Sequence, residues 1–222
     1  MEKDIINCEQ EKFLKFFATV SALRSSFYFT GGTALSHFYL KHRFSEDLDF
    51  FSEKEFDVKE ITPFLRKGKK LLDYKTIDFQ QSFNRNLFYF VFTSKKALKV
   101  EFTYFPFPQI EKPKLRDGLS VDSLRDIAVN KVFAINQNPR GRDFFDLYFI
   151  LKKENWDILE LLKQARNKFD WQVDPFHFAN QLFKIRKMFD DPILAKDDFD
   201  LNIIKEYFIK LSKEIGNKAI KK

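Results

Sequence analysis

The chain has 222 residues, of which 44% are hydrophobic and 32% charged, a composition typical of a soluble globule with one substantial domain or two small ones. Its formal net charge of +7 favours a polyanionic partner, although charge alone does not single out nucleic acid. The single cysteine, Cys8, excludes an internal disulfide framework. The charges dispersed through the N-terminal residues exclude a signal peptide or membrane span there, so we expect a cytoplasmic protein.

Helix and strand patterns alternate in the first half of the chain. Apolar residues that recur every three or four positions predict helices, and short runs of β-branched and aromatic residues predict strands. Helices are expected over residues 9–23, 33–41 and 57–70. Strands are expected over residues 27–30, 46–51, 71–80, 86–93 and 97–105. Residues 1–115 are therefore predicted to form an α/β core with an N-terminal helix.

The second half of the chain is predicted to be helical. Capping residues followed by apolar stripes mark the helix starts. The expected starts are Asp122, Asn138, Asn155 and Asp174, and a last amphipathic helix covers residues 201–215. The predicted fold class is α+β, with a helical region over residues 116–222 packed on the core.

Two of the six glycines, Gly31 and Gly32, stand together between a predicted strand and a predicted helix. Adjacent glycines allow positive φ and a close approach to a ligand, and amides at a helix start attract an anion such as phosphate. Asp47 and Asp49 lie two residues apart in the next predicted strand, so both carboxylates point to one face, about 6.6 Å apart along the chain. Like charges so close repel unless a cation separates them, and oxygen ligands suit Mg²⁺ or Mn²⁺. Taken singly, the glycines also fit a simple strand-to-helix turn and the aspartates an exposed cap.

Together with Arg43 and Ser45, the Gly31-Gly32-Thr33 loop and the paired aspartates resemble the nucleotidyltransferase (DNA polymerase β-like) superfamily. GGTAL followed by HRFSEDLDFF is more narrowly similar to the nucleotidyl transferase AbiEii/AbiGii toxin family of abortive-infection and toxin–antitoxin systems. A second matching block extends from residue 126 to residue 148. The resemblance implies a nucleotidyltransferase-type mixed sheet flanked by helices and a triphosphate cradled by the loop. It also implies that Arg43 and Ser45 contact phosphate or hold the glycine loop, with turn chemistry as their alternative.

Glu101 lies in the last predicted strand, on the face that also carries Lys99 and Thr103. Two-metal phosphoryl chemistry commonly uses a third carboxylate that completes the metal site and helps to deprotonate the attacking hydroxyl. The alternative is an acid on the solvent face of an edge strand. The resemblance favours the functional role, with Asp47, Asp49 and Glu101 as metal ligands.

Lys131 falls on or beside the apolar stripe of the first C-terminal helix, where a lysine can also simply extend to solvent. The resemblance implies a functional lysine there, near the triphosphate, whose charge it would counter. Asp143 matches the family's second acid and would orient Lys131 or bind the base or acceptor. Asp146 lies on the same helical face and is alternatively a structural partner of Arg140 or Arg142.

These residues predict a nucleotidyltransferase that uses Mg²⁺ or Mn²⁺ to pass NMP from an NTP to a hydroxyl, with the helical region completing the active site. The resemblance implies that the acceptor is RNA, with tRNA as a candidate, and that an antitoxin encoded nearby restrains the enzyme. Two alternatives remain open. One is transfer to a small hydroxylated molecule, as in antibiotic-modifying relatives, and the other is a catalytically inactive interaction module on the same fold.

Overall fold

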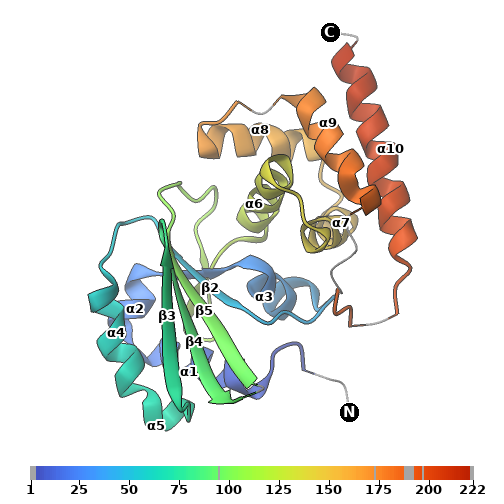
Figure 1. Ribbon diagram of the computed structural model, residues 1–222. Helices are drawn as coiled ribbons and strands as arrows, with labels where there is room; N and C mark the ends of the chain where they lie inside the picture. The colour runs from blue at the N-terminus through green and yellow to red at the C-terminus, as the bar shows by residue number, and fades with distance from the viewer. Residues whose placement is uncertain (1–3, 95, 173, 188–192, 197, 221–222) are drawn as a thin grey trace. The chain divides into compact units, whose positions relative to one another are not determined.

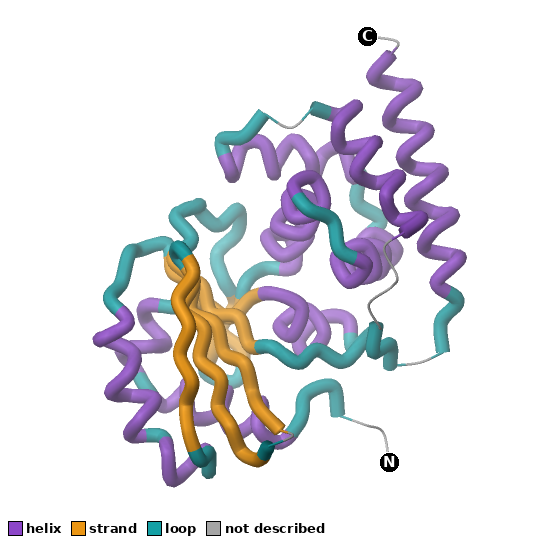
Figure 2. The backbone as a smooth tube through the Cα atoms, viewed as in Figure 1, coloured by secondary structure: helices purple, strands orange, loops and turns teal. Residues whose placement is uncertain are grey.

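The computed structural model describes residues 4–94, 96–172, 174–187, 193–196 and 198–220 (Figures 1 and 2). The chain divides into two compact units, Met1–Ser123 and Leu124–Lys222, and each is described by itself.

One mixed sheet forms the centre of the first unit. In the described part of the chain its strands are β1 Tyr28–Thr30, β2 Leu48–Ser52, β3 Thr76–Ser82, β4 Arg85–Thr93, β5 Lys96–Tyr104, β6 Lys114–Arg116 and β7 Leu119–Val121. They lie in the order β3-β4-β5-β2-β1-β7-β6. β2 pairs parallel with β5 and β1 pairs parallel with β7, whereas the other neighbours are antiparallel. The mixed sheet confirms the predicted α+β class.

Phenylalanines attach the first helix to one face of this sheet. The helices of the first unit are α1 Cys8–Thr19, α2 Ser21–Ser26, α3 Gly31–Leu35, α4 Val58–Lys67 and α5 Lys69–Leu72, and a π-helix, Ser36–Leu40, follows α3 directly (Figure 1). The ring of Phe17 on α1 lies 4.1 Å from that of Phe50 and 6.2 Å from that of Phe102, between centroids. All three side chains are buried. Aromatic packing therefore builds the core between α1 and the central strands.

The strand register separates this apolar face from a polar one. Phe50 lies opposite Phe102 in the parallel pair of β2 and β5, and Asp49 lies opposite Glu101 in the adjacent position. Because successive side chains of a strand point to opposite faces, the two acids lie on the face away from the phenylalanines. The core thus occupies one side of the central strands, and the candidate carboxylates occupy the other.

Two predicted helices of the first unit are each divided in two. Val20 takes an extended conformation between α1 and α2, in line with the low helix propensity of a β-branched residue. Gly68 separates α4 from α5 and lies against Phe16, whose ring a Cβ at position 68 would approach within 2.8 Å. The strand expected next begins only at Thr76, because α5 continues further and ends with Asp73 in the left-handed conformation.

The hairpin of β6 and β7 has no counterpart among the predicted strands. Its turn contains Asp117 and Gly118, with φ of 48° and 77°. Two consecutive positive φ values are what a two-residue hairpin turn requires, so the Asp-Gly dipeptide was the available signal. β7 pairs with β1 through Val121 and Phe29, which extends the first unit to Ser123, whereas the expected boundary is near residue 115.

The second unit is helical in its described part. It consists of α6 Leu124–Gln137, α7 Gly141–Glu154, α8 Ile158–Phe169, α9 Pro175–Phe183, a short 3₁₀ helix Lys184–Lys187 and α10 Leu201–Ile220. Asp174 caps α9, and Pro175 occupies its first turn, as predicted. No helix in the described residues combines the length and apolar character needed to cross a membrane.

Two predicted helix starts in this unit are displaced. α7 begins after Arg140 rather than at Asn138. Asn155 ends α7 in the left-handed conformation, and Asp157 caps α8 by accepting a hydrogen bond from the amide of Leu159. Asparagine suits both an N-cap and a left-handed C-cap, so its position in the sequence did not distinguish the two.

Candidate active site

The predicted carboxylates meet on the polar face of the sheet. Asp49 lies opposite Glu101 in the pairing of β2 with β5, and Asp47 comes one residue before β2. The ammonium of Lys99 lies 2.7 Å from Oδ2 of Asp47 and 3.9 Å from Oε2 of Glu101. One cationic group therefore reaches two of the three predicted metal ligands.

The glycine pair lies directly against this group. Gly31 has a φ of 77°, and a Cβ at this position would collide with Oδ2 of Asp49. A Cβ on Gly32 would collide with Nη2 of Arg43 and lie 3.3 Å from Oγ of Ser45. The structure thus brings the predicted loop, Asp49 and the residues of the intervening turn together. Only glycine fits at position 31, both for its backbone conformation and for the space left by Asp49.

Side chains from two helices hold the irregular turn that leads into the aspartates. Gln10 of α1 is buried, and its amide nitrogen donates to the carbonyls of Ser45 at 2.7 Å and Glu46 at 3.0 Å. The other end of the same side chain accepts a hydrogen bond from the amide of Asn7 at 2.9 Å, in the capping box of α1. The hydroxyl of Thr33 donates to the backbone carbonyl of Asp47. These contacts fix the backbone position from which the side chain of Asp47 extends.

Glu101 is buried and surrounded by donors. Arg85 binds it through Nε and Nη2, each 2.6 Å from a carboxylate oxygen, and Thr103 donates to Oε1 at 2.7 Å. Burial alone would raise the pKa of Glu101, but the hydrogen bonds from Arg85 and Thr103 and the charges of Arg85 and Lys99 outweigh it and lower the pKa below its ordinary value. Glu101 is therefore ionised at neutral pH and is a weak base, which suits binding a cation better than accepting a proton.

The ligand types in this group are those that a divalent cation prefers. Carboxylate oxygens are the ligands that Mg²⁺ and Mn²⁺ prefer, and the Lys99 ammonium already stands as a cation between Asp47 and Glu101. As the side chains stand, no group of three or more His, Cys, Asp or Glu in the described residues is arranged to hold a metal ion. A divalent ion bound by Asp47, Asp49 and Glu101 would thus require Lys99 to move.

The second unit contains its own buried charge cluster, between α6 and α7. Lys131 donates to Oδ1 of Asp143 at 2.7 Å and lies 2.8 Å from Oδ2 of Asp146. Arg140 donates to Oδ2 of Asp143 at 2.9 Å, and both aspartates are fully buried. Lys131 therefore does not simply extend into solvent. The contacts give Asp146 an ion-pair partner in Lys131. Of the two arginines considered as partners of Asp146, Arg140 binds Asp143 instead and Arg142 is exposed.

This cluster keeps Asp143 ionised. Burial would raise its pKa, but the charges of Lys131 and Arg140 and their hydrogen bonds lower it overall. The anionic Asp143 holds the Lys131 ammonium through the 2.7 Å hydrogen bond, and an orienting role in the active site stays a prediction.

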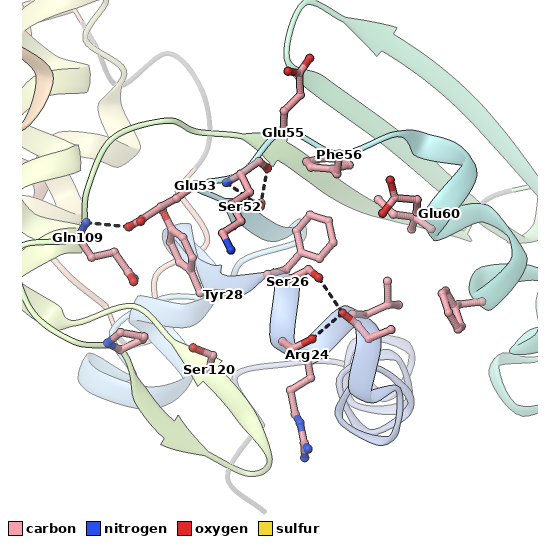
Figure 3. A pocket seen from close by; sticks show the side chains of 18 residues that line it. Arg24, Ser26, Tyr28, Ser52, Glu53, Glu55, Phe56, Glu60, Gln109 and Ser120 are labelled. Carbon is pink, nitrogen blue, oxygen red and sulfur yellow. Dashed lines mark hydrogen bonds between the residues drawn. The ribbon is translucent and has the colours of Figure 1, made fainter.

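A separate hollow of about 650 Å³ lies at the other end of β1 and β2 (Figure 3). Tyr28, the first residue of β1, and Ser52, the last of β2, line it, whereas Thr30 and Asp49 pair at the opposite end of these strands. At its edge Glu53 accepts a hydrogen bond from the amide of Gln109 at 2.9 Å. None of the predicted site residues lines this hollow, so it is not part of the candidate active site.

Sequence reasoning missed three residues that shape the carboxylate group. The contact of Lys99 with this group was indicated by its sequence position, because it lies two residues before Glu101 on the same strand face. No sequence pattern indicated the contact of Arg85 with Glu101, because it depends on the register of β4 against β5. Gln10 acts from a helix far away in the sequence, and only its capping-box spacing was visible.

Comparisons with known proteins identify a family and a fold. The profile of a family described as nucleotidyl transferase AbiEii toxin, type IV toxin–antitoxin system, matches residues 13–214. An uncharacterised protein of Aquifex aeolicus (strain VF5) is 35% identical over 149 residues, which cover 65% of this chain and 67% of that protein.

Two crystal structures from Helicobacter pylori share the fold. One, provisionally classed as a nucleotidyltransferase, has a TM-score of 0.63 at 21% identity and covers 96% of this chain and 94% of its own. The other, JHP933, has a TM-score of 0.62 at 21% identity, with 96% and 91% covered. At such identities the similarity establishes the fold, which is of the expected nucleotidyltransferase type.

Proposed function

The chain belongs to the nucleotidyl transferase AbiEii toxin family of type IV toxin–antitoxin systems, and on this basis we propose that it transfers a nucleoside monophosphate from an NTP to a hydroxyl acceptor. In this reaction the acceptor hydroxyl loses its proton to solvent and its oxygen bonds to the α-phosphorus, the bond from that phosphorus to the oxygen bridging to the β-phosphorus breaks, and pyrophosphate leaves. The observation that supports the proposal most is the contact between the glycine bend and Asp49, opposite Glu101.

The residues of the first unit would position the substrates. Asp47, Asp49 and Glu101 would hold Mg²⁺ or Mn²⁺, which when bound neutralises phosphate charge. The Gly31-Gly32-Thr33 loop would cradle the triphosphate beside Asp49, because glycines let the backbone approach a ligand closely. Arg43 and Ser45, which adjoin Gly32, would contact the phosphates or hold the loop in place. Phosphoryl transfer needs mainly positioning and charge neutralisation, and these residue types supply both.

Lys131 and Asp143 of the second unit enter the proposal through the family resemblance. Lys131 would counter the charge of the triphosphate, and Asp143 would hold its ammonium in place through the 2.7 Å hydrogen bond. Asp146, 2.8 Å from the same ammonium, would share this positioning role.

For the acceptor we propose RNA, with tRNA as a candidate, and for regulation an antitoxin encoded nearby. The net charge of +7 is compatible with an RNA partner. Cytoplasmic activity follows from this choice of acceptor and from the single cysteine, Cys8.

The test is transfer of label from α-³²P NTPs to total RNA, with aminoglycosides as a parallel acceptor. We expect labelled RNA with the wild-type protein and none with the double variant Asp47→Asn and Asp49→Asn. Asp170→Asn is a matched control, because Asp170 is exposed and its φ of 46° is one that asparagine tolerates. Transfer retained by a folded double variant would refute the role of the aspartates. Label on aminoglycosides alone would replace RNA by a small-molecule acceptor.

A further inference from the structure

The position of Lys99 among the carboxylates has a consequence for metal binding. Its ammonium contacts Asp47 at 2.7 Å and lies 3.9 Å from Glu101, and its side chain is 24% exposed. Glu101 is buried and Asp47 is only partly exposed, so their mutual repulsion is weakly screened by water. Lys99 relieves this repulsion within the protein itself.

Arg85 also binds Glu101, but in a different way. Its guanidinium forms two parallel hydrogen bonds of 2.6 Å to the two carboxylate oxygens, a fixed geometry typical of arginine. A lysine ammonium is a compact charge on a flexible stem, held here by one hydrogen bond to Asp47. Of these two cations, Lys99 is therefore the one that can leave the carboxylates without breaking a paired contact.

We propose that Lys99 is an internal counter-ion that competes with the divalent cation for Asp47 and Glu101. The proposal rests on the metal role assigned above to these carboxylates. While Lys99 occupies the site, the acids are neutralised and the protein is stable without metal. Binding of Mg²⁺ or Mn²⁺ requires displacement of the ammonium, so Lys99 lowers the affinity of the nucleotide-free protein for metal. An anionic triphosphate that attracts the displaced ammonium would favour this exchange.

The test is Mn²⁺ binding to the full chain without nucleotide, measured by calorimetry or by electron paramagnetic resonance. Lys99→Met keeps the length of the side chain and removes its charge. Removing a positive charge that lies within about 4 Å of the metal-binding carboxylates removes its repulsion of the ion, so we expect Mn²⁺ affinity to rise about ten-fold or more. Lys99→Arg retains the charge and should bind Mn²⁺ no more tightly than the wild type.

Lys96→Met is the matched control. Lys96 lies on the same strand and forms an ion pair of 2.7 Å with Glu9, away from the three carboxylates. Lys96→Met removes the same formal charge as Lys99→Met, so it reports any effect of net charge alone. Its Mn²⁺ affinity should stay within about two-fold of that of the wild type. Thermal unfolding in EDTA gives a second readout. Lys99→Met should unfold at a lower temperature than the wild type and recover on adding Mn²⁺.

The outcomes separate this inference from the proposed function. If Lys99→Met binds Mn²⁺ no more tightly than the wild type, while Asp49→Asn abolishes binding, the metal site stands and the competition by Lys99 is refuted. If neither the wild type nor Lys99→Met binds Mn²⁺, the proposed metal role fails and the inference fails with it.

Discussion

The close approach of Gly31 to Asp49 gives the sharpest prediction, the effect of Gly31→Ala. Two separate penalties follow from the structure. The φ of 77° is a left-handed conformation that costs a residue with a Cβ about 1–2 kcal/mol. The new methyl group would also collide with Oδ2 of Asp49, and overpacking of this kind costs about 1–3 kcal/mol more.

Gly118 provides a control with the same backbone strain. Its φ is also 77°, and a Cβ there would lie 3.2 Å from the Cβ of Ala18, in the turn of the edge hairpin of β6 and β7. Gly118→Ala should therefore lose about 1–2 kcal/mol of stability, or roughly 2–8 °C in Tm for a chain of this size. Gly31→Ala should lose more, and the difference between the two variants measures the displacement of Asp49.

The decisive assay is NMP transfer under conditions where both variants are folded. A displacement of about 1 Å at a reacting centre costs about 100-fold in rate, so we expect Gly31→Ala to lose about two decades of kcat and Gly118→Ala to retain its activity. Equal activities in the two variants would contradict the reasoning, because the carboxylate would then tolerate a methyl group in its place.

Three further predictions follow from contacts described above. Gln10→Met should lower the free energy of unfolding by about 1–3 kcal/mol and reduce kcat, because it frees the turn before the aspartates. Asn7→Ala removes only the helix cap, so it should lose about 1 kcal/mol and keep its kcat. Urea unfolding measures the stability of both variants, and initial rates measure their kcat. A Gln10→Met variant with wild-type kcat would show that the hydrogen bonds from Gln10 to this turn are not needed for catalysis. Because the folded pKa of Glu101 lies below its unfolded value, its contribution to stability is complete above about pH 4.3 and is lost as the pH falls through the folded pKa. Urea midpoints measured from pH 7 to pH 3 should therefore fall less steeply for Glu101→Gln than for the wild type, and parallel curves would contradict this. Lys168→Met should cost about 3–5 kcal/mol in thermal unfolding, because it removes the 2.7 Å ion pair of the buried Asp126, and adding Asp126→Leu should recover much of the loss. A single variant as stable as the wild type would argue against that ion pair.

The parts of the site that are local in sequence could be predicted from it. The paired glycines, the alternation of Asp47 and Asp49, and the shared face of Lys99 and Glu101 all depend on the geometry of one turn or one strand. The register that sets Asp49 opposite Glu101 depends instead on which strands become neighbours. No local pattern fixes that choice.

The errors have equally physical causes. The Asp117-Gly118 turn was overlooked because its flanking strands have only three residues each, too few to show an alternating pattern. The two predicted helices that are divided break at Val20 and at Gly68, and the break at Gly68 reflects close packing against Phe16 from another helix. The ion pair of Arg85 with Glu101 likewise arises from tertiary structure alone.

The parallel pairing of β2 with β5 also bears on the order in which the protein folds. Residues 53–95 separate the two strands and include α4, α5, β3 and β4. Pairing between segments so distant in the chain closes a long loop and is slow compared with local helix formation. During synthesis, Glu101 can join the aspartates only after β5 has left the ribosome, so a nascent chain shorter than this lacks one of the three carboxylates proposed to act together.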